Sequence, residues 1–199
     1  MPYRKHLSKD KVLKDLVKNH DGFEVKQKEH ILLFVCDSII GQQLSIKVAA
    51  VIFNRFLGLF KTKTPNAKDI LAVPHEELRS IGLSNSKAIY IKNVCRFFIE
   101  NKITNAKLYK MSNDEVLALL TQIKGVGKWT TEMILMFALG RQDVFSSGDL
   151  GLQKAMIQLY KIEHGNKKEL EEKMHLIASN WAPYRTYACL YLWKYFDNK

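Results

Sequence analysis

The chain has 199 residues, 47% of them hydrophobic, and its 31 Lys and Arg outnumber 20 Asp and Glu to give a net charge of +11. This length can bury a sizeable core, and the excess of positive charge favours a polyanionic partner. The longest uncharged run near the N-terminus, Ile31 to Cys36, is too short to span a bilayer, and no signal-peptide pattern opens the chain. We therefore expect no membrane partner.

Apolar residues recur at helical spacing along the whole chain. In the first half this pattern predicts helices over residues 12–17, 30–40, 48–57 (capped by Ser45), 74–81 (begun by Pro74 and closed by Gly82) and 88–98. In the second half it predicts helices over 112–123, 130–139, 152–159 and 170–181, and a last helix that begins at Pro183. No Asn-Gly or Asp-Gly turn joins alternating strands, so the fold is expected to be all α.

Cysteine and histidine spacing argues against the common metal sites. Cys36, Cys95 and Cys189 are odd in number and far apart, which suits buried thiols in a reducing compartment. The same spacing excludes an iron-sulfur loop. The six histidines show no paired-ligand spacing, so we expect no zinc site.

The central stretch 119–152 holds two apolar helical runs joined by Gly125-Val126-Gly127. Both glycines can take positive φ, so the chain can reverse within a few residues. The amides of Gly127, Lys128 and Trp129 then lie at a helix N-terminus, which attracts anions. A Walker phosphate loop is excluded because it needs a Gly at position 122, where Gln stands, and a Ser or Thr at 129, where Trp stands. A phosphate-binding helix-hairpin-helix and an ordinary helical hairpin both remain open.

Asp149 follows the flexible run Ser146-Ser147-Gly148 and precedes a predicted helix. Its structural role would be an N-cap worth about 1 kcal/mol. A carboxylate at this position is kept ionised by the helix dipole and by amide hydrogen bonds. Because such a charge repels a nucleic acid, its place after a phosphate-binding hairpin favours a catalytic use, facing a cation that forms during the reaction.

Four separated motifs resemble one protein family. They are IIGQQLS at 39–45, LRSIGLSNSKAIY at 78–90, IKGVGKWTTEMIL with VFSSGDLGL at 123–152, and WAPYRTYACLYLW at 181–193. In this order they are similar to the helix-hairpin-helix (HhH-GPD) DNA glycosylases, in the branch of 3-methyladenine DNA glycosylase II. The resemblance implies two helical subdomains with an active-site cleft between them. Within one catalytic unit of 1–199, we expect terminal helices in 1–40 and 141–199 and a central bundle in 41–140, with the hairpin at 121–130.

The resemblance also implies roles for individual residues. Asp149 would be the catalytic carboxylate, and Trp129 and Trp193 would line the base pocket. Gln42 and Gln43 would lie at the minor groove, where Gln43 would fill the gap left by an extruded nucleotide. The remaining assignments concern the hairpin: the amides of Gly125, Gly127 and Thr130, with Lys128 beside them, would hold a DNA phosphate, and the carbonyls of Thr121, Ile123 and Val126 would bind a structural monovalent cation. Each has a plainer reading, since a Trp at helical spacing is usually core and a Gln pair is usually solvated.

One position separates two mechanisms in the family. Members that also cut the DNA backbone carry a Lys two residues after the second hairpin Gly, where it forms a Schiff base. Trp129 stands there in this chain, and Lys128 is one residue early. The resemblance therefore implies a monofunctional glycosylase that releases alkylated purines with water and needs no cofactor for catalysis. Met133 and Leu150 occupy positions where an aromatic residue often helps to form the pocket, which leaves the substrate range open.

Two alternatives remain: a non-catalytic binder of damaged or bent DNA that uses the hairpin alone, and a glycosylase with lyase activity through Lys128. The expected partner is double-stranded DNA containing damaged bases, and the expected state is a monomer. The expected location is the cytoplasm (the nucleoid) in a bacterium or the nucleus in a eukaryote.

Overall fold

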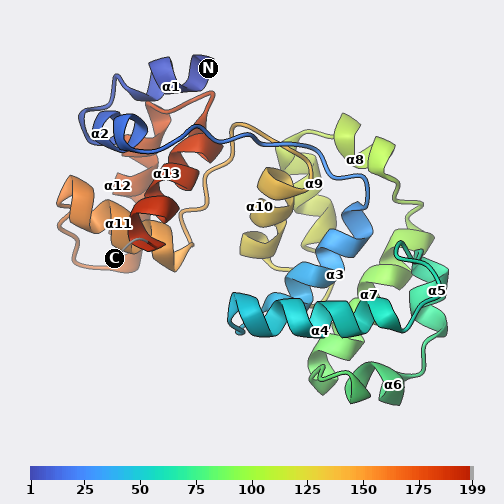
Figure 1. The fold of residues 1–199 in the computed structure, drawn as a ribbon. Helices are drawn as coiled ribbons and strands as arrows, with labels where there is room; N and C mark the ends of the chain where they lie inside the picture. Colours follow the sequence, from blue (N-terminus) through green and yellow to red (C-terminus); the bar gives the residue numbers. More distant parts are fainter. Residues whose placement is uncertain (198–199) are drawn as a thin grey trace. The chain divides into compact units, whose positions relative to one another are not determined.

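The computed structural model describes residues 1–197, and within them the chain is all helical, as predicted. The chain divides into two compact units, which we call unit 1 (Met1–Lys26 with Gly140–Lys199) and unit 2 (Gln27–Leu139) (Figure 1). No helix in the described part of the chain is long and apolar enough to cross a membrane.

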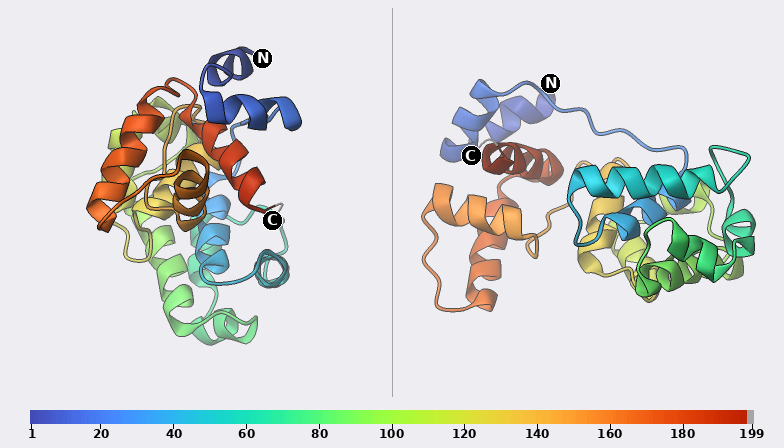
Figure 2. Two further views of the ribbon diagram at one scale, coloured as in Figure 1. Left: turned by 90° about the vertical axis from the view of Figure 1, so that its left-hand side faces the viewer. Right: turned by 60° about the horizontal axis from the view of Figure 1, so that its bottom comes forward.

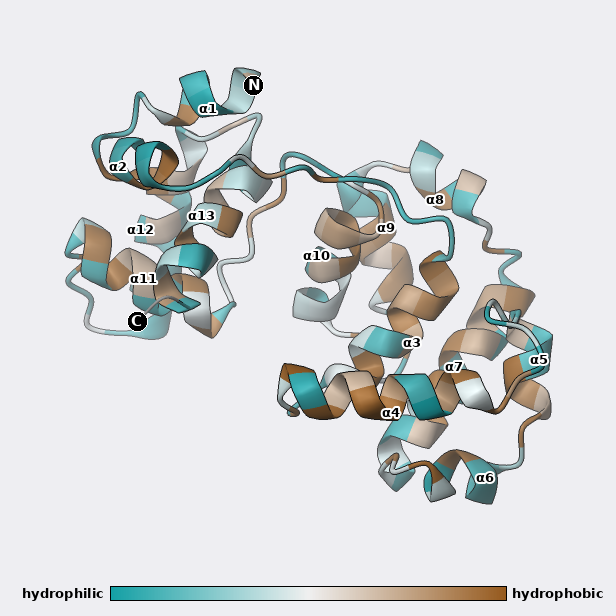
Figure 3. Cartoon of the chain, in the orientation of Figure 1, coloured by the Kyte–Doolittle hydropathy of each residue, from teal (hydrophilic) through white to brown (hydrophobic). Residues whose placement is uncertain are grey.

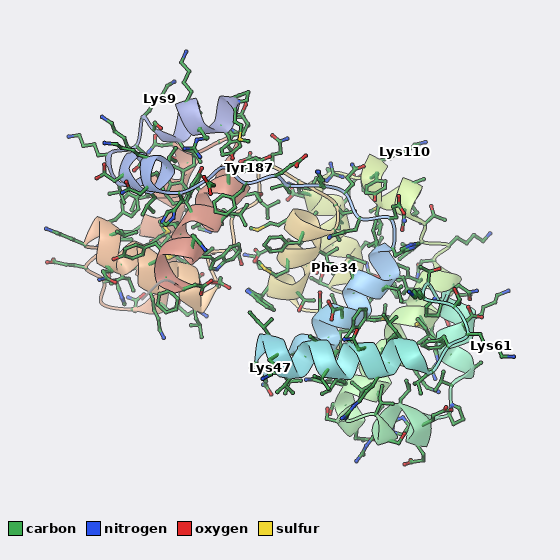
Figure 4. The ribbon with its side chains drawn as sticks, in the orientation of Figure 1. Lys9, Phe34, Lys47, Lys61, Lys110 and Tyr187 are labelled. Carbon is green, nitrogen blue, oxygen red and sulfur yellow. The ribbon has the colours of Figure 1, made fainter. Side chains whose placement is uncertain are left out.

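Unit 1 is built around its last helix. This helix, α13, packs against α11 and α2, and its Tyr187, labelled in Figure 4, stacks on Tyr3 with ring centroids 3.9 Å apart. Trp181, Tyr191 and Leu13 are fully buried in the core of this unit. The helices of unit 1 are α1 (Pro2–Leu7), α2 (Lys11–Asn19), α11 (Leu150–Tyr160), α12 (Lys167–Ser179) and α13 (Arg185–Asp197).

Unit 2 is built around a buried apolar helix. This helix, α3, contacts α4, α7 and α10. Figure 3 shows it mostly in the apolar colour with one hydrophilic turn, and Figure 2 gives two further views of the chain. Six of its residues are buried, which explains why it lacks an amphipathic pattern. The helices of unit 2 are α3 (Ile31–Gly41), α4 (Ile46–Gly58), α5 (Ala67–Ala72), α6 (His75–Ser80), α7 (Asn85–Glu100), α8 (Asn105–Lys110), α9 (Asn113–Leu120) and α10 (Lys128–Phe137).

The N-terminal boundary between the units differs from the expected one. We expected residues 1–40 to belong to the terminal subdomain, but unit 2 begins at Gln27. The reason is the composition of α3: most of its residues are apolar and need cover, and α4, α7 and α10 of unit 2 provide it. The other boundary falls at residues 139–140, one residue from the expected place.

Several helices begin at the capping residues that the sequence contains. Ser45 caps α4 by accepting a hydrogen bond from the amide of Val48, as predicted. Ser112 and Glu115 form the complete capping box of α9. Pro74 lies at the N-cap of α6, one residue before the position that we expected. Three helices of six residues each, α1, α5 and α8, were not predicted, because so few residues give no measurable period.

Candidate active site and DNA-binding elements

Asp149 is the N-cap of α11, as the sequence predicts. Its Oδ1 accepts a hydrogen bond from the amide of Leu152 at 2.9 Å. The same Oδ1 accepts a second hydrogen bond, from the indole Nε1 of Trp193 on α13, also at 2.9 Å. The side chains of Asp149 and Trp193 are both half-buried, so this carboxylate is fixed by two donors and still reaches the surface of unit 1.

Trp193 approaches Asp149 because Gly151 lies between them without a side chain. A Cβ at Gly151 would lie 3.2 Å from Asp149 Oδ1 and 3.3 Å from Trp193 Cδ1. Contacts this short are tighter than most Cβ contacts, so a larger residue would push the indole or the carboxylate aside. Sequence reasoning assigned Trp193 to the base pocket and missed both its bond to Asp149 and the role of Gly151. Only the short spacing from Asp149 to Gly151 could have signalled the latter.

The segment before Asp149 is pinned, which corrects the expectation that Ser146-Ser147-Gly148 is flexible. Ser146 and Ser147 are buried, and Gln153 donates from its side chain to the Ser147 carbonyl at 2.8 Å. The imidazole of His175 lies 3.0 Å from the Ser147 hydroxyl. α11 and α12 therefore both hold the segment, and Asp149 enters α11 from a fixed position.

The start of α13 holds the beginning of the same segment. Arg185 donates to both carboxylate oxygens of Asp143 at 2.7 Å, and this ion pair lowers the pKa of the Asp143 carboxyl. The Thr186 hydroxyl donates to the Arg141 carbonyl at 2.7 Å and accepts from the Val144 amide at 3.0 Å. α13 thus fixes the segment at residues 141–144 and also carries Trp193, which reaches Asp149. These supporting residues lie in a motif that the sequence analysis singled out, but their partners are about 40 residues away and left no local pattern.

The hairpin between α9 and α10 is tight, but its two glycines differ. Gly125 has φ of +107°, and a Cβ there would lie 2.3 Å from the Tyr90 ring, so glycine is required. Gly127 has φ of −91° and ψ of 179°, and a Cβ added there would meet nothing within 4 Å. The expectation of positive φ at Gly127 is therefore wrong, because Gly125 alone makes the left-handed turn. Gly127 is an N-cap with open space beside it.

The N-terminus of α10 has the form expected of an anion site. Its N-cap, Gly127, provides no side-chain cap, and both Gly127 and Lys128 are exposed. Thr130 is buried in the first turn, whereas Trp129 is 45% exposed. Lys128 leans along the helix, with Nζ 3.9 Å from Oε1 of Glu132. First-turn amides that lack a side-chain cap are suited to donate hydrogen bonds to a phosphate oxygen.

The two glutamines after α3 are placed differently from each other. Gln43 is exposed and takes φ of +58°, a left-handed conformation that is uncommon for a residue with a side chain. Gln42 instead donates from its side-chain amide to the Gly125 carbonyl at 3.1 Å. The structure therefore brings Gln42 together with the hairpin, within unit 2. Asp149 and Trp193 form a second cluster, within unit 1, and the pairing of Trp129 with Trp193 in one base pocket stays a prediction.

Potential metal ligands are of two kinds, side chains and the carbonyls of the hairpin. Within residues 1–197 no cluster of three or more His, Cys, Asp or Glu residues could hold a metal ion. The hairpin carbonyls of Thr121, Ile123 and Val126 are a different kind of donor set. The Ile123 carbonyl accepts a hydrogen bond from the Val126 amide at 2.9 Å, which leaves one lone pair of that oxygen for another partner.

Comparison of the sequence with known protein families identifies the family of this chain. Residues 36–179 match the HhH-GPD superfamily of base excision DNA repair proteins. This chain belongs to that family. A DNA-3-methyladenine glycosylase 1 from Schizosaccharomyces pombe is 32% identical over 92% of this chain and 80% of its own length. Membership makes the chain a DNA glycosylase of base excision repair, with DNA as its partner.

Solved structures agree with the sequence relatives. A DNA-3-methyladenine glycosidase from Bacillus halodurans superposes with a TM-score of 0.85 and 36% identity, over 98% of this chain and 89% of that one. A 3-methyladenine DNA glycosylase from S. pombe, solved in complex with abasic DNA, superposes with a TM-score of 0.84 and 31% identity, over 98% and 96% of the two chains. The predicted family and fold are thus confirmed.

Proposed function

We propose that this HhH-GPD protein is a monofunctional glycosylase that hydrolyses the N-glycosidic bond of flipped-out alkylated purines, of the 3-methyladenine and 7-methylguanine type, and leaves an abasic site. The observation that carries the proposal is Asp149, a carboxylate held at the N-cap of α11 by the Leu152 amide and the Trp193 indole while it stays half-exposed. The names of its relatives support the substrate class.

Phosphate contacts position the DNA in the proposed reaction. A base inside a duplex cannot be reached, so it must be turned out at a cost of a few kcal/mol of unstacking. The first-turn amides of α10 and the charge of Lys128 hold the backbone, and such contacts carry no base information. Gln43 stands exposed at the turn after α3, where its side chain can enter the gap in the stack.

The bond is broken by departure of a base that already carries positive charge. An N3- or N7-alkylated purine leaves as a neutral base without a proton donor, and the positive charge moves to the sugar. The ionised Asp149 stabilises that charge and orients the attacking water. Trp193 contributes its N–H to Asp149 and its indole face to a cationic base, for which cation-π attraction is worth roughly 0.5 to 2 kcal/mol.

A lyase step is not part of the proposal. Trp129 occupies the position where lyases of the family carry their Schiff-base Lys, and Lys128 lies beside Glu132 on the side of α10. For a monovalent cation at the hairpin, the donor set of Thr121, Ile123 and Val126 carbonyls fits, because neutral oxygen ligands suit a hard ion of low charge. Such an ion would strengthen the positive potential where the phosphate binds.

The proposed partner is duplex DNA with damaged bases, bound by a monomer, in the bacterial nucleoid or the eukaryotic nucleus. A base-release assay on methylated duplex DNA tests the proposal, with the released bases identified by mass spectrometry. We expect free 3-methyladenine and 7-methylguanine, an intact backbone and no covalent product on borohydride treatment with an abasic oligonucleotide. Binding without base release would favour the non-catalytic binder, and a borohydride-trapped adduct would favour the lyase.

A further inference from the structure

The first turns of α7 reach both DNA-binding elements of unit 2. Lys87 extends its ammonium to the C-terminus of α3, where Nζ donates to the carbonyls of Ile40 at 2.9 Å and Gln42 at 2.6 Å. One turn later, Tyr90 packs against Gly125 of the hairpin, so closely that no Cβ fits there. Residues three apart on a helix share a face, so one face of α7 supports the Gln42-Gln43 turn and the hairpin together.

The hydrogen bond to Gln42 acts next to the residue that the proposed function uses as a wedge. The carbonyl of Gln42 belongs to the peptide that joins it to Gln43, so a donor on this oxygen fixes the peptide plane from which Gln43 projects. Gln43 takes φ of +58°, a conformation that costs of order 1 kcal/mol or more for a residue with a side chain. Such a conformation persists only where its surroundings hold it.

A second hydrogen bond connects the same Gln42-Gln43 turn to the hairpin. The Gln42 side-chain amide donates to the Gly125 carbonyl at 3.1 Å. A chain of contacts therefore runs from Lys87 on α7, through the Gln42-Gln43 turn, to Gly125 of the phosphate-binding hairpin. This chain sets the distance between the two elements.

Lys87 uses two of its three N–H donors on the carbonyls of Ile40 and Gln42. Its side chain is half-buried, and burial lowers the pKa of its ammonium. The last carbonyls of an α-helix lack intrahelical partners and carry partial negative charge, so they offset part of the cost of burying the ammonium.

We propose that Lys87 is a positioning residue for nucleotide extrusion, which holds the Gln42-Gln43 turn in register with the phosphate-binding hairpin and makes no phosphate contact itself. The inference rests on the proposed function, because it assigns the wedge to Gln43. Catalytic steps are sensitive to small misplacements: an error of about 1 Å can cost 100-fold in rate.

α7 supplies a matched control for this lysine. Lys92, also half-buried, caps a different helix in the same manner: its Nζ donates to the carbonyls of Val73 at 2.6 Å and Leu71 at 3.4 Å, at the end of α5. Lys87→Met and Lys92→Met each remove an ammonium from a helix C-terminus and keep the aliphatic stem. Any general effect on the fold should therefore appear in both variants, and urea unfolding measures it.

The test compares base extrusion by the two variants. A 2-aminopurine placed next to the lesion in duplex DNA fluoresces more strongly when its neighbour leaves the stack. We expect Lys87→Met to lower this signal and the single-turnover rate of base release about tenfold or more, while Lys92→Met keeps both at the wild-type level. Lys87→Arg, which retains a cation with several donors, should recover most of the signal and shows that a folded protein was measured.

The salt dependence of DNA binding shows whether Lys87 is a positioning residue or contacts a phosphate directly. A lysine that binds a phosphate directly reduces the slope of log K against log salt by about one when it is removed. We expect the same slope for the wild type and Lys87→Met. A reduced slope, or equal extrusion by Lys87→Met and Lys92→Met, would overturn the proposal. The extrusion signal needs no chemistry, so failure of the wild type to release a base would count against the proposed function alone.

Discussion

Unit 1 contains two Asp-Trp pairs that look alike locally. Asp10 is the N-cap of α2 and accepts a hydrogen bond from the indole of Trp181 at 3.1 Å. Asp149 is the N-cap of α11 and accepts one from the indole of Trp193 at 2.9 Å. In both pairs the helix amides and the indole N–H fix an acidic side chain.

The two acids are both half-buried, and the pairs differ in the burial of the tryptophan and in the carboxylate oxygen that each donor meets. Trp181 is fully buried, and Asp10 uses both oxygens: Oδ1 accepts from the amides of α2 and from Tyr160, and Oδ2 accepts from Trp181. At Asp149 the amide and the indole meet the same Oδ1, and both side chains stay half-exposed. The first arrangement holds a core together, whereas the second orients a charge that reactants can reach.

The largest expected difference comes from neutralising each acid. In Asp149→Asn the amide oxygen can still accept from the Leu152 amide and the Trp193 indole, so the cap is kept while the negative charge is lost. We expect single-turnover base release to fall by about two orders of magnitude or more, the scale of losing one preorganised charge, with little change in stability.

Asp10→Asn is the matched control for this change. Its amide nitrogen cannot accept a hydrogen bond, so one of the donors at Asp10 loses its acceptor, at a cost of roughly 1–3 kcal/mol in the free energy of unfolding. Base release by the folded protein should stay at the wild-type rate. Similar losses of base release in both variants would show that Asp149 affects the rate through the fold and not through its charge.

The next comparison removes each indole donor and keeps an aromatic ring. Trp193→Phe should lower base release about tenfold, since a hydrogen bond to a charged group is worth about 1.5–3 kcal/mol and 1.4 kcal/mol is tenfold. Because Phe still offers an aromatic face to a cationic base, the loss should be similar for cationic 7-methylguanine and neutral hypoxanthine, with binding to abasic DNA retained.

Trp181→Phe should instead reduce stability and leave base release unchanged, because its partner is Asp10. Urea unfolding and single-turnover kinetics on both variants provide the measurement. If Trp193→Phe slowed the release of cationic bases alone, the indole would act through its face and not through Asp149.

The smallest expected effect concerns the gap beside Asp149. Gly151→Ala places a methyl group 3.2 Å from Asp149 Oδ1 and 3.3 Å from Trp193 Cδ1, which shifts one of them by a few tenths of an ångström. We expect a loss of a few-fold in base release with stability unchanged or slightly raised, because Ala favours a helix over Gly by about 1 kcal/mol. Gly58→Ala, at the end of α4 with nothing within 4 Å of the new methyl, is the control. Wild-type activity in Gly151→Ala would mean that the pair tolerates displacement.

Local patterns in the sequence predicted the local features of the fold. Periodicity placed the helices of eight or more residues, the Ser-x-x-Glu pattern placed the capping box of α9, and Asp149 was identified as an N-cap. Three six-residue helices, α1, α5 and α8, were not predicted because packing against neighbours, not an internal period, stabilises such short segments. The fourth helix of this length, α6, was predicted from Pro74 and Gly82, which mark its two ends.

Features that depend on distant partners could not be predicted. Trp193 meets Asp149 across 44 residues, and Lys87 meets the Gln42 carbonyl across 45. A Lys on a helix and a Trp at helical spacing give no sign of what they contact until the chain is folded. The same holds for the boundary at Gln27, because it depends on the cover that α3 receives from other helices.

The most direct test of the difference between the two pairs is a double-mutant cycle on Asp149 and Trp193. Single-turnover release of 7-methylguanine is measured for the wild type, Asp149→Asn, Trp193→Phe and the double variant. If Trp193 acts through the carboxylate charge, Trp193→Phe slows the wild type but adds little in the Asp149→Asn background, because coupled residues are not additive. The same loss in both backgrounds would contradict the account and show that Trp193 works independently of Asp149.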